Sequence, residues 1–482
     1  MSFAFADSPM GGGDDGPSDV SAGKSWLLHR AKSTKAPKLV TDGAAESSLL
    51  ERIASIQNLA VALEKVASND GAPGVDRRSV EEVVAAAPRL IFVLQRELLS
   101  GDYQPGDIRR VWIPKPGGGQ RGLGIPNVVD RWVQESVRRV LEPIFEPHFH
   151  PSSHGFRPGR GAATAIAEAK EYVAAGCEWV VDMDLSKFFD RVHHQRLLAR
   201  LGQRVADPRV LTLVSRMLKA EVVLPDGVRI PTKEGTPQGG PLSPLLSNVV
   251  LDELDWELER RGLRFVRYAD DCNIFVGSER SGHRVMDSTR RFVERKLRLL
   301  LNDKKSAVAR PEERHFLGFR LRVSEDGQVQ VHISARTRER LNTRIRELTP
   351  RTWGQSLDAL FKSVNTYLRG WMGYFRICTE EGARLFGRFD AHIRRRIRAI
   401  VIHQKKRPRH LFRHLLRCGV PRRSARNTAF RRCGTWKRSW LPGMHRAYPN
   451  AWFHERLTSL AVTWERYQPS RAVSRQGMLF DV

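Results

Sequence analysis

The sequence predicts an α+β body followed by an all-α basic tail, with the boundary near residue 333. Before that boundary, short β-branched and aromatic runs bounded by Gly, Pro and Asp alternate with segments of helical periodicity. After Ala335 every periodic segment is helical. The tail is also distinct in charge, because Ala391 to Trp440 holds 17 Lys and Arg and no Asp or Glu.

Composition narrows the class of protein. A chain of 482 residues with 41% apolar content is long enough for two or three domains with real cores. It carries 81 Lys and Arg against 53 Asp and Glu, a formal net charge of +28. This excess favours a polyanionic partner over the alternative of a merely soluble basic protein. The tail interleaves its cations with aromatic residues, a pattern that suits phosphate contacts with base stacking.

Cysteine usage and hydropathy exclude several classes. The five cysteines form no C-x-x-C pair and show no Cys/His ligand spacing, which argues against a zinc knuckle and a disulfide framework. The first residues lack a basic segment followed by an apolar one, and no run of 18 apolar residues occurs. We therefore expect a cytoplasmic protein, in the bacterial cytosol or nucleoid, without a membrane partner.

The first elements are helical and then form a hairpin. Residues 1–45 read as a disordered leader rich in Gly, Ser and Asp. Apolar spacing from Ser47 to Val66 predicts an amphipathic helix, which the turn residues of "SNDGAPGVD" end. Gln104 to Pro126 predicts two strands, "IRRVWIPKP" and "GLGIP", around a "GGG" turn. The tip of this hairpin carries Lys115 and Arg121.

Helices and strands then alternate. Helices are predicted for Asp130 to Phe145 and Gly161 to Ala174, joined by "HPSSHGFRPGRG". "EWVVDMDLSKFFDRV" begins as a strand and continues as a helix or turn. Residues 193–220 are helical, "VLPDGVRI" is an Asp-Gly hairpin, and "GTPQGGPLSPLLSN" is a Gly/Pro loop opening a long helix. The body ends with a helix at 283–300 and the Asp-Gly hairpin "FLGFRLRVSEDGQVQVHIS".

Paired carboxylates stand out in "RFVRYADDCNIFVGS". Asp270 and Asp271 join two apolar strands, where like charges repel and lose hydration. A second strand, "WVVDMDL", ends at Asp184, and the two strands side by side would bring the three carboxylates together. Such a set of hard oxygen ligands suits Mg²⁺, which shares substrate phosphates. Two such ions can serve nucleotidyl transfer.

The ordered motifs resemble one family. "YADD", preceded by "DLSKFFD" and "GTPQGGPLSPLLSN" and followed by "LNDKKSAV" and "FLGFRL", is similar to bacterial group II intron-encoded reverse transcriptase/maturases. The resemblance runs from "NDGAPGVD" to about residue 460. It implies a right-hand polymerase of fingers and palm over residues 46–333. A helical thumb (domain X) at 334–415 and a basic RNA- and DNA-binding region at 416–482 would follow.

The resemblance also implies roles for single residues. Asp184, Asp270, Asp271 and the carbonyl of Leu185 would bind two Mg²⁺ ions. Lys305, in "LNDKKS", matches a lysine that protonates the leaving pyrophosphate; its alternative is simply another cation.

Other positions would contact nucleotides and the primer. Phe189 would exclude a ribose 2′-hydroxyl, or else is a core aromatic. Tyr268 would pack near the primer terminus, or else is an ordinary strand aromatic. Arg131 would hold triphosphate or template, or else lies on a solvated helix face. The remaining implied contacts are the fingers cations Lys115 and Arg121, the base-pair loop of Gln238, Gly239 and Gly240, and the primer grip of Phe316, Leu317 and Gly318.

The helical tail resembles the maturase thumb, which binds intron RNA. The positions that we select as RNA contacts are Arg394, Arg395, Arg396, Lys405, Lys406, Arg407 and Arg409. The chain ends at "QGMLFDV" without the Cys-pair and His-Asn-His endonuclease region of many relatives. We therefore expect the endonuclease-lacking type associated with class C introns.

These features lead to one main hypothesis and two alternatives. The main hypothesis is an RNA-directed DNA polymerase that helps a group II intron splice and move, with intron RNA, target DNA, a DNA primer and dNTPs as partners. It would act as a monomer or homodimer. One alternative is a domesticated reverse transcriptase of phage defence or DNA repair. The other is an RNA-binding splicing chaperone that does not polymerise.

Overall fold

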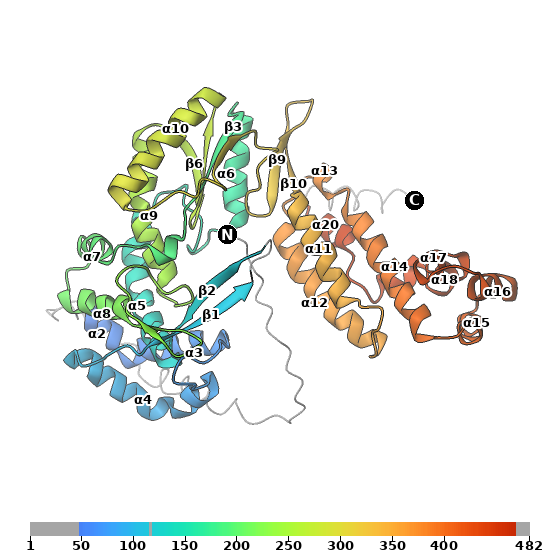
Figure 1. The fold of residues 1–482 in the computed structure, drawn as a ribbon, viewed down its shortest axis with the longest axis horizontal. Coiled ribbons are helices and arrows are strands. Elements are labelled where there is room, and N and C mark those ends of the chain that lie inside the picture. Colours follow the sequence, from blue (N-terminus) through green and yellow to red (C-terminus); the bar gives the residue numbers. More distant parts are fainter. Residues whose placement is uncertain (1–47, 115–117, 469–482) are drawn as a thin grey trace, which may run out of the picture. The chain divides into compact units, whose positions relative to one another are not determined.

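The computed structural model describes residues 48–114 and 118–468 (Figure 1). These residues form two compact units. The first comprises residues 48–169 and 177–309, and the second comprises residues 170–176 and 310–468. The predicted fold class is confirmed: an α+β body precedes a helical tail.

Four helices form the base of the first unit. They are α2 (Leu49–Ala54), α3 (Ile56–Ser68), α4 (Val80–Ser100) and α5 (Val128–Phe145). The prediction of one continuous helix from Ser47 to Val66 is wrong at Ser55, whose extended backbone ends α2 and whose side chain caps α3. On α5, the fully buried Trp132 donates its indole N–H to the Leu59 carbonyl at 2.6 Å. This bond ties α5 to α3.

A small sheet contains the two predicted hairpins. Strands β1 (Ile108–Pro114) and β2 (Gln120–Ile125) pair antiparallel, and β4 (Val222–Val223) pairs with β5 (Arg229–Ile230). Because β1 also pairs with β4, the order of strands is β2-β1-β4-β5.

The larger sheet carries the predicted carboxylates. Its strands are β3 (Trp179–Asp184), β6 (Arg264–Tyr268), β7 (Asp271–Val276) and β8 (Ala307–Ala309), in the order β6-β7-β3-β8. All neighbouring pairs are antiparallel. Helix α10 (Glu279–Phe292) packs on β3, β7 and β8, and α9 (Ser243–Arg260) contacts β6.

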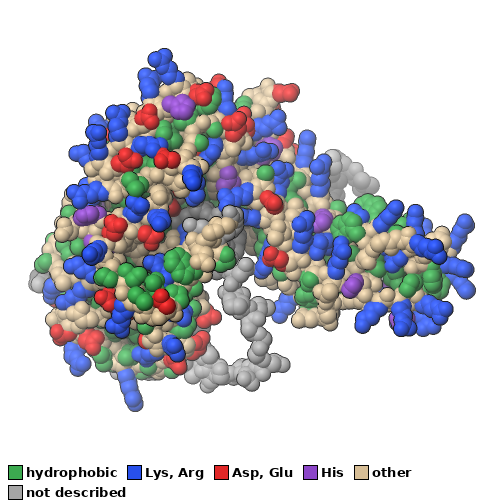
Figure 2. All heavy atoms as spheres, in the orientation of Figure 1, with side chains coloured by type: hydrophobic (Ala, Val, Ile, Leu, Met, Phe, Trp, Pro, Cys, Tyr) green, Lys and Arg blue, Asp and Glu red, His purple; other side chains and the backbone are tan. Residues whose placement is uncertain are grey.

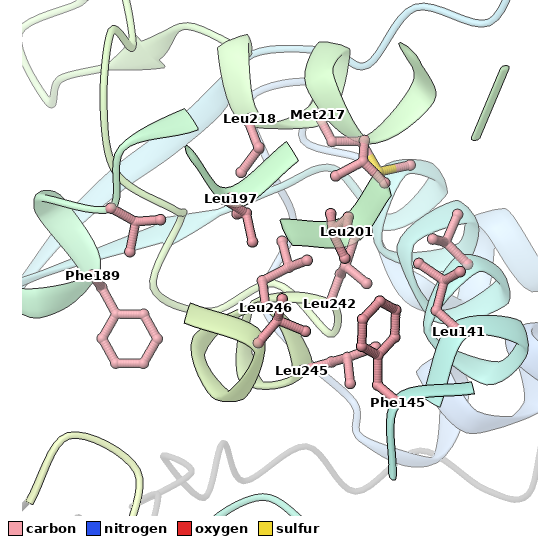
Figure 3. Packing of buried hydrophobic residues seen from close by; sticks show 14 of the residues in the cluster. Leu141, Phe145, Phe189, Leu197, Leu201, Met217, Leu218, Leu242, Leu245 and Leu246 are labelled. Carbon is pink, nitrogen blue, oxygen red and sulfur yellow. The ribbon is translucent and has the colours of Figure 1, made fainter. Parts of the chain in front are cut away.

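Apolar side chains from several helices fill the core of the first unit. Figure 3 shows leucines of α7 (His194–Gly202) between the ends of α8 (Pro208–Lys219) and α9, with Leu141 and Phe145 of α5 beside them. Three short helical elements complete this unit: η1 (Glu146–His148), η2 (Phe188–Asp190) and the π-helix η3 (Val293–Leu297). The longer helix α6 (Ala162–Ala174) begins in this unit, and its last residues belong to the second unit.

The second unit begins with the predicted Asp-Gly hairpin, β9 (Phe319–Val323) and β10 (Val329–Ile333). Within the described residues, every later regular element is a helix. These are α11 (Ala335–Leu348), α12 (Leu357–Phe375), α13 (Glu380–Ala383), α14 (Phe386–Gln404), α15 (Pro408–Arg417), α16 (Arg422–Phe430), α17 (Thr435–Arg438), α18 (Pro442–Ala447), α19 (Asn450–His454) and α20 (Leu460–Arg466).

Among the helices of residues 48–114 and 118–468, none combines the length and the apolar character that a membrane span requires.

Candidate polymerase site

The tight turn between β6 and β7 carries the first two carboxylates. Tyr268 pairs with Asp271 across the hairpin, so Ala269 and Asp270 alone make the turn. Ala269 has φ +57°, a left-handed conformation that L-residues rarely adopt. We call Ala269 to Asp271 the catalytic turn.

The third carboxylate faces this turn from the neighbouring strand. Asp184 is the last residue of β3 and lies directly opposite Asp271, as the sequence predicts. Its carboxylate accepts hydrogen bonds from Asn302 Nδ2 at 3.2 Å and from Lys305 Nζ at 3.0 Å. Its backbone N–H donates to Ser306 Oγ at 3.1 Å. The "LNDKKS" segment therefore orients Asp184.

Asp270 has a raised pKa and a buried oxygen atom without a hydrogen-bond partner. Burial, together with the negative charges of Asp271 and Asp184, raises its pKa from 3.8 to about 6. Its Oδ1 atom is buried and accepts no hydrogen bond. An unpaired buried carboxylate oxygen beside two further carboxylates fits a divalent cation.

The three carboxylates do not close around a cation by themselves. Within the described ranges, no three His, Cys, Asp or Glu side chains converge as a ready-made metal cage. Mg²⁺ usually takes only one or two protein carboxylates and completes its shell with water and substrate phosphates. Asp184, Asp270 and Asp271 therefore fit the predicted metal site, while their individual roles stay predictions.

Stability of the metal-free protein should depend on the charge of Asp270. Because its pKa is raised on folding, its contribution is fully present below about pH 4 and is lost as pH rises through about 6. In EDTA, we expect Asp270→Asn to raise the free energy of unfolding at pH 7.5 by about 2 to 3 kcal/mol, about two pKa units at 1.36 kcal/mol each. At pH 4 we expect almost no change. Urea titrations at both pH values measure this.

The matched control is Asp287→Asn, because Asp287 is an exposed carboxylate on α10. It should leave the free energy of unfolding unchanged at both pH values. An Asp270→Asn protein no more stable than wild type at pH 7.5 would show that the carboxylates do not repel each other in the fold.

A buried ion pair holds the catalytic turn in place. The side chains of Arg267 and Asp255 are both 0% exposed and lie 2.6 Å apart, Nη2 to Oδ2. The Arg267 guanidinium also donates to the Ala269 carbonyl at 2.9 Å, to Asn248 Oδ1 at 3.0 Å and to Ser153 Oγ at 2.7 Å. Arg267 thus ties the left-handed residue of the turn to α9 and to the loop before α6.

The predicted base-pair loop contacts the fingers hairpin. Gln238 accepts a hydrogen bond from Arg121 Nε at 3.0 Å through its side chain and one from Gly124 N at 3.0 Å through its carbonyl. A Cβ on Gly239 would lie 2.7 Å from the Gly124 carbonyl oxygen, and one on Gly240 would lie 2.3 Å from Gln134 Oε1. Both glycines are therefore also needed for packing inside the protein, beyond any approach to nucleic acid.

Several predicted contacts lie deeper than the sequence suggested. Arg131 is 9% exposed and donates to the carbonyls of Gly71 and Ala72, so the alternative of a solvated helix face is wrong. Phe189 is 8% exposed, with its ring 5.1 Å from that of Phe188, centroid to centroid. Tyr268 and Leu185 are also buried. Their nucleotide-binding and metal-binding roles stay predictions.

One predicted cation is outside the described residues, and the predicted primer grip belongs to the second unit. Lys115 falls outside the described residues. Phe316 to Gly318 belong to the second unit, where Phe316 and Phe319 exchange backbone hydrogen bonds around a turn with Leu317 and Gly318 at positive φ. Tyr374 Oη donates to the Leu317 carbonyl at 2.9 Å and holds this turn on α12.

The seven predicted RNA contacts differ in their exposure and in their partners. Arg395 donates to the Trp436 carbonyl and lies 4.1 Å from the Trp436 ring centroid, while Arg396 donates to the Thr349 carbonyl at the end of α11. Both arginines therefore hold the second unit together. Three further residues are exposed: Lys406 and Arg407 lie between α14 and α15, and Arg409 lies in the first turn of α15. Arg394 and Lys405 are intermediate in exposure.

A basic groove includes Lys406 and Arg407 of the exposed residues, and Arg409 is next in sequence to its lining residue His410. Its volume is about 490 Å³, and its lining residues are Gln404, Lys405, Lys406, Arg407, His410, Arg413 and Arg417. Figure 2 shows Lys and Arg side chains crowding the part of the surface that Figure 1 labels α15 and α16. A groove lined by cations and without a carboxylate suits phosphate groups.

Sequence reasoning missed the residues that orient the site. Asn302 and Ser306 belong to the same "LNDKKS" motif as Lys305, so the motif could have predicted that they also contact Asp184. Arg267 and Asp255 gave no such signal, because a charged residue in a strand or helix is usually solvent-exposed.

Comparisons with known proteins agree with this geometry. The model of the family "Reverse transcriptase (RNA-dependent DNA polymerase)" matches residues 113–321, and that of "Group II intron, maturase-specific domain" matches residues 338–419. Protein YkfC of Escherichia coli K12 is 34% identical over 364 residues, which cover 66% of this chain and 95% of YkfC.

Two further likenesses cover smaller shares of the other proteins. Group II intron-encoded protein LtrA of Lactococcus lactis subsp. cremoris is 28% identical over 54% of this chain and 53% of its own length. The chain thus matches about half of LtrA. In a solved structure of telomerase from Candida albicans, the likeness covers 57% of this chain and 54% of that chain, with 12% identity and a TM-score of 0.38.

Three observations indicate the same family. They are the carboxylates at the catalytic turn, the two matched family models and the near-complete coverage of YkfC. The chain contains an RNA-dependent DNA polymerase domain followed by a maturase domain. It belongs to the group II intron reverse transcriptase/maturase family.

Proposed function

We propose that the protein extends a DNA primer on an RNA template by two-Mg²⁺ nucleotidyl transfer and that it assists the splicing and mobility of a group II intron. The observation that carries the polymerase proposal is the placement of Asp184 opposite Asp271, with the unpaired Oδ1 of Asp270 in the adjoining turn. Splicing assistance is supported by the maturase-domain match and by the basic groove.

In this proposal Asp184, Asp270 and Asp271 would hold the metal ions. Mg²⁺ held there would supply activation of the primer 3′-hydroxyl and charge neutralisation at the leaving pyrophosphate. Lys305, whose ammonium contacts Asp184, would give a proton or positive charge to that leaving group. Arg121, joined to Gln238, orients the loop that would line the nascent base pair. Arg267 keeps the turn in one conformation.

The polymerase proposal is tested with purified protein, a DNA primer annealed to an RNA template, and the four dNTPs. We expect extension with Mg²⁺ and none with EDTA. Absence of extension with Mg²⁺ across a range of salt concentrations overturns the proposal.

The splicing proposal needs a separate test, because RNA binding does not require the carboxylates. We expect the Asp270→Ala/Asp271→Ala variant to assist splicing of the surrounding intron RNA at low Mg²⁺ as well as wild type does. If the gene lies outside any RNA that folds as a group II intron, the maturase role fails. The alternative of a domesticated polymerase would then remain.

RNA binding at the basic groove should be strongly salt-dependent. The logarithm of the association constant should fall linearly with the logarithm of salt concentration, by about 0.7 to 0.9 for each phosphate contact. We expect the triple variant Lys406→Gln/Arg407→Gln/Arg409→Gln to reduce this slope by about 2 units. Filter binding of structured RNA between 50 and 400 mM salt measures it.

The control removes equal charge elsewhere. Arg280, Arg284 and Arg291 are exposed on α10, and their replacement by Gln should change the slope by much less. Equal slopes for the two triple variants would mean that net charge alone attracts the RNA, with no contribution specific to the groove.

A further inference from the structure

Phe156 combines a left-handed backbone conformation, which is unfavourable for a bulky residue, with a partly exposed side chain. It adopts φ +61°, and its side chain is 36% exposed. The residues around it, Ser152 to Gly155 and Arg157, are all buried. Bulky residues rarely occupy the left-handed region, and where they do the cause is often a functional constraint.

The chain before Phe156 is fixed to the catalytic turn. The N–H of His154 donates to the Arg267 carbonyl at 2.9 Å, and Asn248 Nδ2 donates to the Gly155 carbonyl at 2.9 Å. Gly155 approaches the turn so closely that a Cβ there would lie 2.3 Å from the Ala269 nitrogen. Phe156 is therefore one residue away from a direct backbone contact with the turn that carries Asp270.

The chain after Phe156 is fixed as firmly. The buried guanidinium of Arg157 donates to the carbonyls of His150 and Ser153 at 2.6 and 2.8 Å and pairs with the Glu146 carboxylate at 2.9 Å. With both flanks held, the backbone of Phe156 keeps its left-handed conformation unless these contacts break. The fold thus leaves a partly exposed aromatic residue next in sequence to the backbone contact with the catalytic turn.

We propose that Phe156 is a nucleic-acid-binding residue whose ring packs on a base or ribose of the template–primer next to the catalytic turn. The inference rests on the proposed polymerase function. A phenyl ring gains nothing from a phosphate, whereas stacking on a nucleotide is favourable and independent of sequence. A protein partner is disfavoured, because interface hot spots lie inside a rim of other contact residues and the exposed sequence neighbours here are Pro151, Pro158 and Gly159.

The decisive variant is Phe156→Gly, because glycine accepts the left-handed backbone and the fold should be retained. We expect an unchanged or higher Tm and an approximately tenfold higher Kd for an RNA–DNA template–primer, measured by fluorescence anisotropy in EDTA. The KM for template–primer should rise while kcat stays within about twofold. Phe156→Trp should restore binding, and Phe92→Ala, which removes an exposed phenylalanine from α4, should leave binding unchanged.

The outcomes separate this inference from the polymerase proposal. If wild type does not extend a primer, the proposed function fails. If wild type extends it and Phe156→Gly binds template–primer as wild type does, the inference about Phe156 is overturned. A lower Tm for Phe156→Gly, without recovery of binding in Phe156→Trp, also overturns it, because Phe156 then serves only the fold.

Discussion

Replacing Asp270 by alanine is expected to lower the rate of RNA-templated primer extension by three orders of magnitude or more. Metal-assisted charge neutralisation contributes several kcal/mol to such reactions, and each 1.36 kcal/mol corresponds to a factor of ten in rate. The same change removes the buried, unpaired Oδ1 and the repulsion with Asp271. Metal-free stability at pH 7.5 should therefore rise while activity disappears.

Higher stability together with lost activity distinguishes loss of catalysis from misfolding. A variant that is inactive because it misfolds would lose stability, so a single-turnover extension assay is paired with urea unfolding in EDTA. Asp287→Asn on α10 should retain both properties. Activity of Asp270→Ala within tenfold of wild type would remove the catalytic turn from the proposed mechanism.

Replacing Arg267 by methionine is expected to destabilise the first unit by about 3 to 5 kcal/mol. The reason is less the loss of the ion pair than the carboxylate that remains, because Asp255 is fully buried and would have no cation. Four hydrogen-bond partners would also lose their donor: Asp255, Asn248, Ser153 and the Ala269 carbonyl. Hydrogen exchange of the β6 and β7 amides measures the loss in this unit directly.

Two variants test that explanation. Arg267→Met/Asp255→Leu should recover part of the lost stability, because no buried charge is left unpaired in the pair. Arg260→Met breaks the exposed pair with Glu257 and should cost less than about 1 kcal/mol. Equal protection from exchange in the Arg267→Met and Arg260→Met proteins would refute a supporting role for the buried pair.

Much of the fold followed from local signals, and the errors have local causes. The hairpins were predictable because Asp-Gly and Gly-rich turns separate short β-branched runs. Helix α4 was not predicted, although Ser79 and Glu82 form a capping box at its start. Its interior contains Pro88 and four β-branched residues, Val83, Val84, Ile91 and Val93, which weaken its helix propensity. Packing on α2, α3 and α5 outweighs them.

The candidate site was predictable only in part. Asp184 ends one strand and Asp271 begins another, and the pattern of both strands is clear, so their proximity could be inferred from the sequence. The hydrogen bonds that support them could not, because Arg267 takes its side-chain partners from residues 12 to 114 positions away. Burial of Arg131 and Phe189 depends likewise on packing between distant helices and loops, which no local pattern encodes.

The bonds between β2 and the loop around Gln238 bear on chimeric enzymes. Arg121 and Gly124 each donate to Gln238, and Gly239 has no room for a side chain against Gly124. If the hairpin of β1 and β2 were replaced by that of a relative, its second strand would not match the loop around Gln238 in hydrogen bonding and packing. Designers who recombine this enzyme with its relatives should therefore exchange residues 120–125 and 236–240 as one cassette, although more than a hundred residues separate them.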